Sequence, residues 1–184
     1  MIGSAASRYS AASAVLVNIW AIGDITFTVQ LKIKTMTTTE MVKVYVNQLC
    51  AEIGCTPESI YNAETKSWYF TRGSVSLEVF MSSYETVVKT VRTFVRCFSP
   101  IFAIPADAMK KAQLYEEALA NNSTFMGVKL SILPEKGFVY AVAERDIDGM
   151  DYIEFKTLIS DLGSWADQLD NQLHARFGST TALN

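Results

Sequence analysis

The side chains that could carry acid–base or metal chemistry are few, and histidine is the scarcest of them. His174 is the only histidine in the 184 residues. A single histidine excludes every motif in which two histidines bind one metal ion, and it leaves one candidate base for a catalytic triad. No nucleophile elbow or paired acid accompanies it in the sequence. We therefore interpret His174 as a polar residue near a helix end, where a cation suits the negative end of the dipole.

The cysteines give no stronger signal for chemistry. Cys50 and Cys55 have a C-x4-C spacing, which is weak for zinc without a second pair. Cys50 follows Leu49 on the apolar face of a predicted helix. Three cysteines also cannot form the fully paired framework of a small secreted domain. We interpret all three as reduced thiols, and Cys50 and Cys55 as buried structural residues.

A cluster of acids suggests calcium at first sight. Asp146-x-Asp148 begins like an EF-hand loop, but Met150 stands at its fifth position and Asp151 at the sixth, which must be glycine. We expect these acids, with Glu154, to form a solvated turn and helix cap. No phosphate-binding glycine loop occurs either. The sequence therefore predicts no catalytic residue, no metal ligand and no cofactor, and we expect that the protein is not an enzyme.

The charge balance argues against a nucleic-acid partner. The chain has 16 Lys and Arg residues against 19 Asp and Glu residues, a net charge of -3 and a pI near 5.2. Binding to phosphates needs a basic stripe, and neither sign of charge gathers into a long block. Aromatic residues such as Trp68 and Phe80 could stack bases on a sheet. Without basic neighbours in number, they are better explained by sheet packing.

The apolar stretch from Ala11 to Gly23 is the one candidate targeting segment. At about thirteen residues, it is too short to span a bilayer. A secretory signal would have a positive start, where only Arg8 stands, and a small-residue cleavage site, where Gly23 is followed by Asp24. We therefore expect a cytoplasmic protein with no membrane partner.

Residues 1–35 differ in texture from the remainder. A Ser/Ala-rich start and the apolar stretch precede a strict alternation of apolar and polar residues over 25–33, which predicts a strand. A capped helix begins immediately afterwards, and Met36 or Met41 would each serve as a translation start. We expect residues 1–35 to be an N-terminal extension outside the core fold, 36–178 a single α+β domain, and 179–184 a tail.

Local signals divide this domain into elements. Thr37 and Glu40 occupy the N-cap and N3 positions of a capping box, and the helix that follows ends at Gly54. A change to period two then predicts an antiparallel meander. Its three strands cover residues 60–63, 67–71 and 75–81. Residues 85–98 fit a helix as well, but their density of Val and Thr favours a strand.

The second half of the domain reads as helix, hairpin and long helix. Pro100 and Pro105 bracket an apolar connector, residues 101–104, which we expect to lie against the core. Asp151 and Glu154 cap the last helix, whose apolar stripe runs to Gly178. The remaining elements are a helix over residues 108–120 and a hairpin whose strands cover 125–133 and 138–143. The fold class is thus α+β, in the order helix, three-strand meander, helix, two-strand hairpin, long C-terminal helix.

Several local patterns resemble a known family. Phe98-Ser99-Pro100-Ile101 followed by Ile104-Pro105 looks like a turn after a long third strand, and Tyr115 to Asn122 looks like a helix ending in a Leu/Asn-rich step. Arg145 to Asp151 and Ala166 to Leu169 also match in position. Over Met36 to Gly178, the chain resembles the YbjN-like family of bacterial regulators and the type III secretion chaperones. The resemblance implies a protein-binding role, often as a homodimer, and brings no catalytic residues.

A surplus of apolar surface points the same way. The strand over 75–81 carries Val75, Leu77, Val79 and Met81 on one face and Phe80 on the other, and the strand over 138–143 is apolar on both. Helices can cover one face, and the other needs a partner, or the predicted strand over 25–33, to be shielded from water. We expect a non-catalytic, chaperone-like or regulatory module that binds a client protein or forms a homodimer. The residues expected to bind protein are Trp68, Phe70, Phe80, Phe138 and Tyr140, with Tyr69 as the alternative to Trp68 and Phe70 on that face.

A rival interpretation stays open. A small-molecule-sensing domain or an undescribed enzyme would have a cleft between the sheet and the Pro100 to Pro105 connector. Convergent polar groups with perturbed titration in a deep pocket would favour that reading. A bare apolar surface would favour the protein-binding one.

Overall fold

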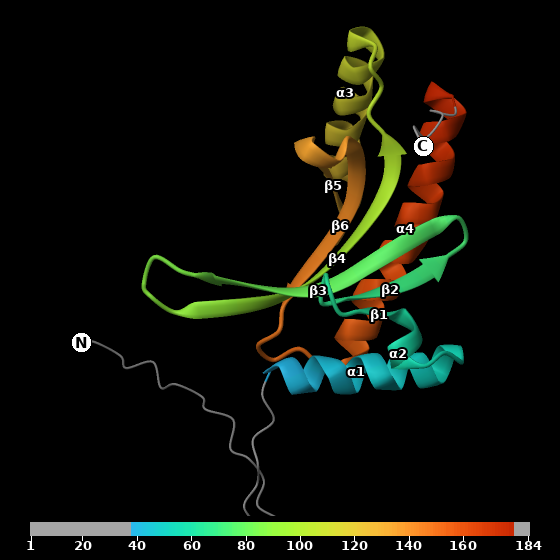
Figure 1. Ribbon diagram of the computed structural model, residues 1–184. Helices are drawn as coiled ribbons and strands as arrows, with labels where there is room; N and C mark the ends of the chain where they lie inside the picture. Colours follow the sequence, from blue (N-terminus) through green and yellow to red (C-terminus); the bar gives the residue numbers. More distant parts are fainter. Residues whose placement is uncertain (1–37, 179–184) are drawn as a thin grey trace, which may run out of the picture. The chain divides into compact units, whose positions relative to one another are not determined.

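The computed structural model describes residues 38–178, which form one twisted antiparallel sheet with helices packed against it (Figure 1). These residues lie in a unit of the chain that begins at Met36. The helices are α1 (Thr38–Ile53), α2 (Pro57–Ile60), α3 (Ala108–Thr124) and α4 (Tyr152–Phe177). The strands are β1 (Tyr61–Asn62), β2 (Ser67–Arg72), β3 (Val75–Glu85), β4 (Val91–Ala103), β5 (Lys129–Leu133) and β6 (Phe138–Asp146). The predicted strand over residues 25–33 lies outside the described residues.

The six strands lie in the order β1-β2-β3-β4-β6-β5. The first four form a meander, and the β5–β6 hairpin adds to it through β6, which pairs with β4. Helix α3 makes the connection between the two groups. The predicted α+β class and order of elements are therefore confirmed, with a short extra helix, α2, before the meander.

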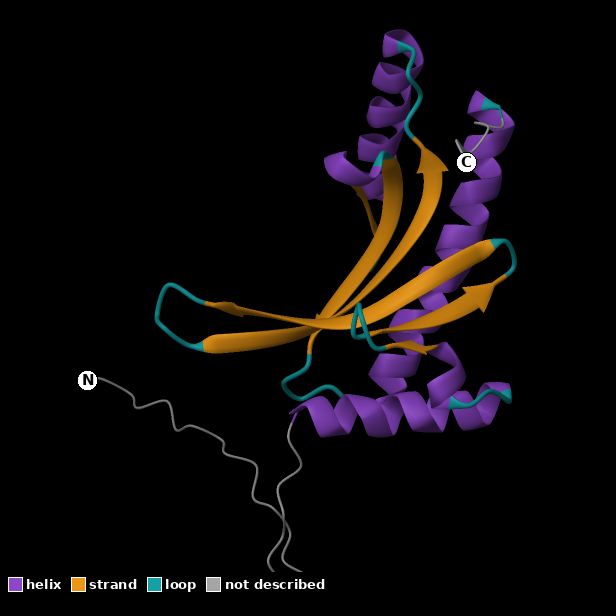
Figure 2. Ribbon diagram, in the orientation of Figure 1, coloured by secondary structure: helices purple, strands orange, loops and turns teal. Residues whose placement is uncertain are grey.

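Helix α4 crosses one face of the sheet and contacts β2, β3, β4 and β6 (Figure 2). Its apolar stripe is buried from Phe155 to Leu173, as the periodicity predicted. Gly163 lets the helix approach closely, since a Cβ there would lie 2.9 Å from Arg72 Cδ and 3.2 Å from Leu77 Cδ1. On the sheet side, Leu77 and Val79 belong to the core on this face, and both are almost fully buried.

The helix ends follow local rules. Asp151 Oδ1 accepts from the Glu154 N–H at 2.8 Å, and the Asp151 N–H donates to Glu154 Oε2 at 3.3 Å, which is the predicted capping box. Gly54, just after α1, has a φ of 76° and provides the predicted left-handed stop. Of the predicted cap at the start of α1, Thr37 lies outside the described residues.

The turn between β2 and β3 is tied to the last helix. Gly73 has a φ of 54°, which suits the first central position of a two-residue hairpin turn. The Ser74 N–H donates to Asp167 Oδ1 at 3.2 Å, and Ser74 Oγ donates to Asp170 Oδ2 at 2.9 Å. The tip of this hairpin is therefore held on α4 by two carboxylates.

The predicted start and end residues of the two middle strands, β3 and β4, were wrong. Strand β3 continues to Glu85, beyond the predicted end at Met81, and the predicted strand 85–98 corresponds to β4, which begins only at Val91. A turn over 86–90 joins them, closed by the Thr86 N–H donating to Thr90 O at 2.8 Å. The two strands form a long hairpin whose end projects from the sheet (Figure 1).

The predicted connector 101–104 is mostly part of β4. The strand continues through Pro100 because the pairing with β6 shifts between Pro100 and Phe102, and such a bulge tolerates a residue without an N–H. Ile101 and Phe102 are 2% and 1% exposed, so the expected contact with the core is confirmed. Strand β5 is shorter than predicted, since it begins at Lys129, and α3 extends to Thr124.

Candidate protein-binding face

The face of the sheet opposite α4 is the open face. Along each strand, successive side chains point alternately to the open face and to the face that α4 covers. On β3, Leu77 and Val79 are buried under α4, while Phe80 points to the open face and is half-buried. Pairing places Phe80 opposite Arg96 of β4, and Phe98 opposite Val142 of β6. Three adjacent strands therefore contribute side chains to this face.

Three aromatic side chains form a cluster at the centre of the open face. The Phe80 and Phe98 rings meet edge to face with centroids 5.3 Å apart, and the Tyr140 ring lies 6.2 Å from Phe98. Phe98 is only 8% exposed although no helix within residues 38–178 covers it. Its neighbours Phe80 and Tyr140 shield it, and so does the Arg96 guanidinium, 4.7 Å from its centroid. Phe98, Phe80, Tyr140 and Arg96 are called the aromatic cluster below.

Ion pairs border this cluster. Arg96 Nε donates to Glu144 Oε2 at 2.9 Å, and Lys129 pairs with the other oxygen of Glu144. The hydrogen bond from Lys129 is the main reason why the pKa of Glu144 lies below its usual value, and Arg96 adds to the shift. Arg92 pairs with Asp146 in the same way. The cations of this border are thus balanced by carboxylates.

Polar groups on the β2 side complete the face. Glu78 Oε1 accepts from Ser67 Oγ at 2.8 Å and from the Tyr69 hydroxyl at 3.0 Å. Burial raises the pKa of the Tyr140 hydroxyl, and the nearby carboxylate of Glu78 adds to the effect. Tyr140 therefore keeps its proton near neutral pH.

The structure divides the predicted binding residues between the two faces. Phe80, Phe138 and Tyr140 lie on the open face and are half-buried. Trp68 and Phe70 are each 5% exposed and belong to the core under the helices, because they pair with Val79 and Leu77. Tyr69 is the β2 aromatic residue on the open face.

Sequence reasoning missed Phe98, Arg96 and Glu144 as members of this face. Phe94, Arg96 and Phe98 occur at alternate positions of β4, which is the spacing of one strand face. The same stretch also fits helical spacing, so the alternation alone did not identify the face.

The candidate chemical groups are dispersed. His174 Nδ1 lies 2.9 Å from the Asp170 carbonyl oxygen, and its ring packs edge-on against Phe102 at 5.0 Å. Burial raises the pKa of the Cys50 thiol to about 12 and also raises that of Cys97, so both are weak nucleophiles. Within residues 38–178, no three His, Cys, Asp or Glu side chains are grouped to hold a metal ion.

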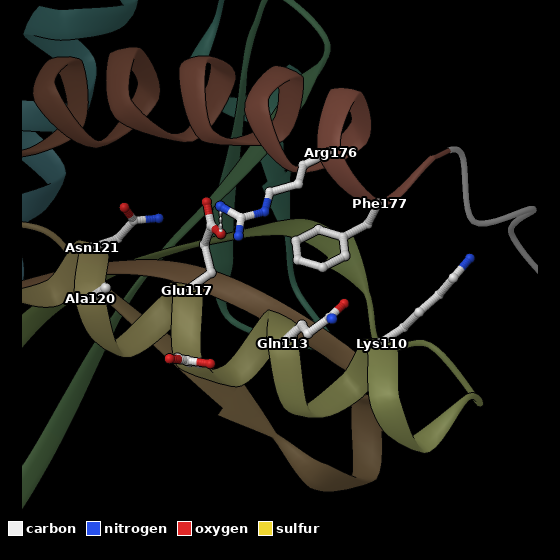
Figure 3. Close-up of a pocket in the computed structure, with 8 residues that line it drawn as sticks. Lys110, Gln113, Glu117, Ala120, Asn121, Arg176 and Phe177 are labelled. Atoms are coloured by element: carbon white, nitrogen blue, oxygen red, sulfur yellow. Dashed lines mark ion pairs between the residues drawn. The ribbon is translucent and has the colours of Figure 1, made fainter.

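A polar cleft lies elsewhere, between α3 and α4 (Figure 3). It has a volume of about 720 Å³ and includes Lys110, Gln113 and Phe177 among its lining residues. The Arg176 guanidinium points across it and pairs with Glu117. This cleft is not the one expected beside the Pro100 to Pro105 connector.

In the part of the chain that the structure describes, no helix combines the length and apolarity needed to cross a bilayer. The longest of these helices, α4, carries charged residues on its exposed side, including Lys156 and Asp161.

The arrangement of the sheet and α4 occurs in known structures. A chain in the crystal structure of the ExsC–ExsE complex is similar over 75% of this chain and 97% of its own length, with a TM-score of 0.54 and 10% sequence identity. The likeness is one of fold. A chain in the structure of the Yersinia pestis type III secretion chaperone SycH with a stable fragment of YscM2 covers 68% of this chain and 97% of its own, at 14% identity and a TM-score of 0.44.

Comparison by sequence adds no relative. No family model matches the sequence, and no curated protein matches it either. The predicted resemblance to secretion chaperones is therefore supported at the level of fold, while the YbjN-like family is not shown.

Proposed function

We propose that this chain is a non-catalytic, chaperone-like or regulatory module that binds protein, either a client or a second copy of itself, on the open face of its sheet. The observation that carries the proposal is the aromatic cluster, which lies on a face that no described helix covers. Its fold neighbour in the ExsC–ExsE complex was also solved in a complex of two proteins.

The composition of the open face is that of a protein interface. Interface centres are enriched in Tyr, Phe and Arg and are bordered by polar groups, and here Phe80, Tyr140 and Arg96 are bordered by the ion pairs of Glu144 and Asp146. Aromatic and Arg side chains are also the usual sites where one substitution costs 2 kcal/mol or more of binding, as an order of magnitude. A client that covers Tyr140 and Phe80 would therefore gain most of its affinity from a small area.

Charge favours protein over nucleic acid as the occupant. Lys and Arg side chains bind a nucleic acid by neutralising its phosphates, which releases the counterions condensed on them. Here Arg96 and Lys129 both bind Glu144, and Arg92 binds Asp146. A phosphate would have to compete with these carboxylates. An apolar or aromatic segment of a protein can instead pack on the rings and leave the ion pairs intact.

The experiment compares Tyr140→Glu with Tyr61→Glu. Tyr61 is a 41% exposed tyrosine whose pairing with Trp68 places it on the other face of the same sheet, so it is a matched control. A photoreactive residue at position 140 is used to cross-link bound proteins in the native host, and mass spectrometry identifies them. Each identified protein is then purified and its affinity for the variants is measured by calorimetry. We expect Tyr140→Glu to weaken binding at least about tenfold and Tyr61→Glu to leave it unchanged.

A charged substitution at Phe80 should act in the same way without unfolding the protein, because Phe80 is only half-buried. Circular dichroism and thermal melts confirm that each variant is folded. Equal loss of binding in the variants of both faces, or binding that survives both Tyr140→Glu and Phe80→Asp, would remove the open face as the binding site.

A further inference from the structure

Strand β3 is much longer than the neighbour on one of its sides. Its pairing with β2 ends at Val79, opposite Trp68, while its pairing with β4 continues to Glu85. Residues 80–85 thus have a strand on one side only among the described residues. Figure 1 shows this part of the β3–β4 hairpin projecting from the sheet with no strand along the outer side of β3.

The hydrogen-bonding direction of these residues follows from the two turns. The two-residue turn makes Arg72 and Val75 a hydrogen-bonded pair, so every second residue from Val75 to Val79 bonds to β2. At the other end, the Thr86 N–H donates to Thr90 O, so Thr86 and every second residue before it bond to β4. Both turns therefore direct the N–H and C=O groups of Met81, Ser83 and Glu85 to the outer side.

The sheet edge formed by β5 is treated differently. Asn122 at the end of α3 acts as a substitute strand there: its Nδ2 donates to Leu130 O at 3.1 Å, and its Oδ1 accepts from the Leu130 N–H at 2.5 Å. Natural proteins usually protect sheet edges by covering groups, Pro, Lys or bulges. Residues 80–85 read Phe-Met-Ser-Ser-Tyr-Glu and contain no Pro or Lys. The outer side of β3 is therefore a strand-pairing template.

We propose that a second copy of this chain pairs with this outer side of β3, antiparallel, so that the two sheets continue into each other across a twofold axis. The two paired edges then have the same sequence. When Ser83 faces Ser83 of the second copy, the outward residues Met81, Ser83 and Glu85 all have a hydrogen-bonding partner. Met81 faces Glu85 of the second copy, and Ser82 faces its Tyr84. Other registers between residues 80 and 85 leave at least one outward residue unpaired.

The side chains along the seam fit this pairing. Ser83 is small and exposed, so its closest approach to its counterpart meets no bulk. Tyr84 is 51% exposed and packs on Phe94 at 5.7 Å, and in the pair it would also cover Ser82 of the second copy. Six residues of edge bury less area than the roughly 800 Å² per partner of a stable interface. We therefore expect a weak dimer, populated at high micromolar concentration.

The test uses substitutions at Ser83 in the full chain. Analytical ultracentrifugation of the wild type should show a mass that rises from 20.4 kDa toward twice that value as concentration reaches several hundred micromolar. Ser83→Lys places two like charges directly opposite each other and should weaken the dimer by up to about fivefold. Ser76→Lys is the matched control: it changes an exposed serine of the same strand where β2 already occupies the edge, and it should dimerise normally.

Oxidative cross-linking tests which residues of the two copies face each other. Cα atoms of a hydrogen-bonded antiparallel pair lie about 5.5 Å apart, a distance that a disulfide spans, so Ser83→Cys should cross-link the two copies. Ser82→Cys, which faces a tyrosine, should not. A wild type that stays monomeric, a Ser83→Lys variant that dimerises as well as the wild type, or cross-linking of Ser82→Cys instead of Ser83→Cys would each overturn the proposal.

The edge and the open face are separable in the same assays. Tyr140 is on β6, away from the outer side of β3, so Tyr140→Glu should lose the client and keep the dimer. Ser83→Lys should keep the client and weaken the dimer. If Tyr140→Glu dissociates the dimer and Ser83→Lys does not weaken it, then the second copy binds on the open face and the edge pairing is refuted.

Discussion

Asn122 offers a sharp test of how the β5 edge is held. Its side-chain amide makes two hydrogen bonds to the backbone of Leu130, a residue that is only 8% exposed. Asn122→Ala removes both. Each such bond contributes about 0.5–1.5 kcal/mol, and water can reach part of this edge, so we expect a loss of about 1–2 kcal/mol in the free energy of unfolding. At roughly 2–4 °C for each kcal/mol, the melting temperature should fall by about 2–8 °C.

Urea denaturation measures the loss, with an unchanged m-value showing that the denatured state is not altered. Asn121→Ala is the control, because it makes the same change of helix propensity one residue earlier, where the side chain lines the cleft between α3 and α4. Asn122→Asp should recover little stability, since a carboxylate accepts from the Leu130 N–H but repels the Leu130 carbonyl oxygen. Equal midpoints for the two alanine variants would refute the capping role of Asn122.

Further predictions concern chemistry, boundaries and pH. His174→Gln, or Cys50→Ala with Cys55→Ala, should leave client binding intact in calorimetry apart from a modest stability cost, and a folded variant that no longer binds would contradict the non-catalytic interpretation. A chain shortened to begin at Met36 should show a cooperative melt, and an insoluble or molten product would place the preceding residues in the core. Because the folded pKa of Glu144 is lowered by Lys129 and Arg96, its stabilising effect is present above its unfolded pKa and is lost as pH falls through the folded one. Melts between about pH 6 and 3 should therefore show a steeper loss of stability for the wild type than for Glu144→Gln, and parallel curves would contradict this.

The sequence predicted the elements that depend on neighbouring residues. The cap formed by Asp151 and Glu154 needs residues only three apart, and the glycine stop after α1 needs one. The strand β4 was harder to predict because Phe98, on the open face, is buried, and so are Val95 and Cys97 on the other face. With apolar residues on both faces, the alternation that marks a strand was obscured, and both the start and the end of β4 were predicted wrongly.

The composition of the open face needed tertiary information. The alternation along β3 placed Phe80 on the correct face. Which β2 side chains share that face, Tyr69 or its neighbours Trp68 and Phe70, depends on the register of β2 with β3, which the sequence does not give. The ion pair between Arg96 and Glu144 joins β4 and β6, which are separated in the chain by α3 and β5 and become neighbours only when the sheet forms. No local sequence pattern predicts an ion pair of this kind.

The position of α4 at the end of the described chain has a consequence for synthesis. When β6 has been synthesised, the part of the sheet that α4 covers is still bare, because α4 is made only afterwards. The β2–β3 turn likewise waits for Asp167 and Asp170 before it is fixed. At about 5–20 residues per second, the α4 segment takes one to several seconds to emerge. During that interval the nascent chain exposes the apolar surface that α4 later covers, and we expect general chaperones to bind it then.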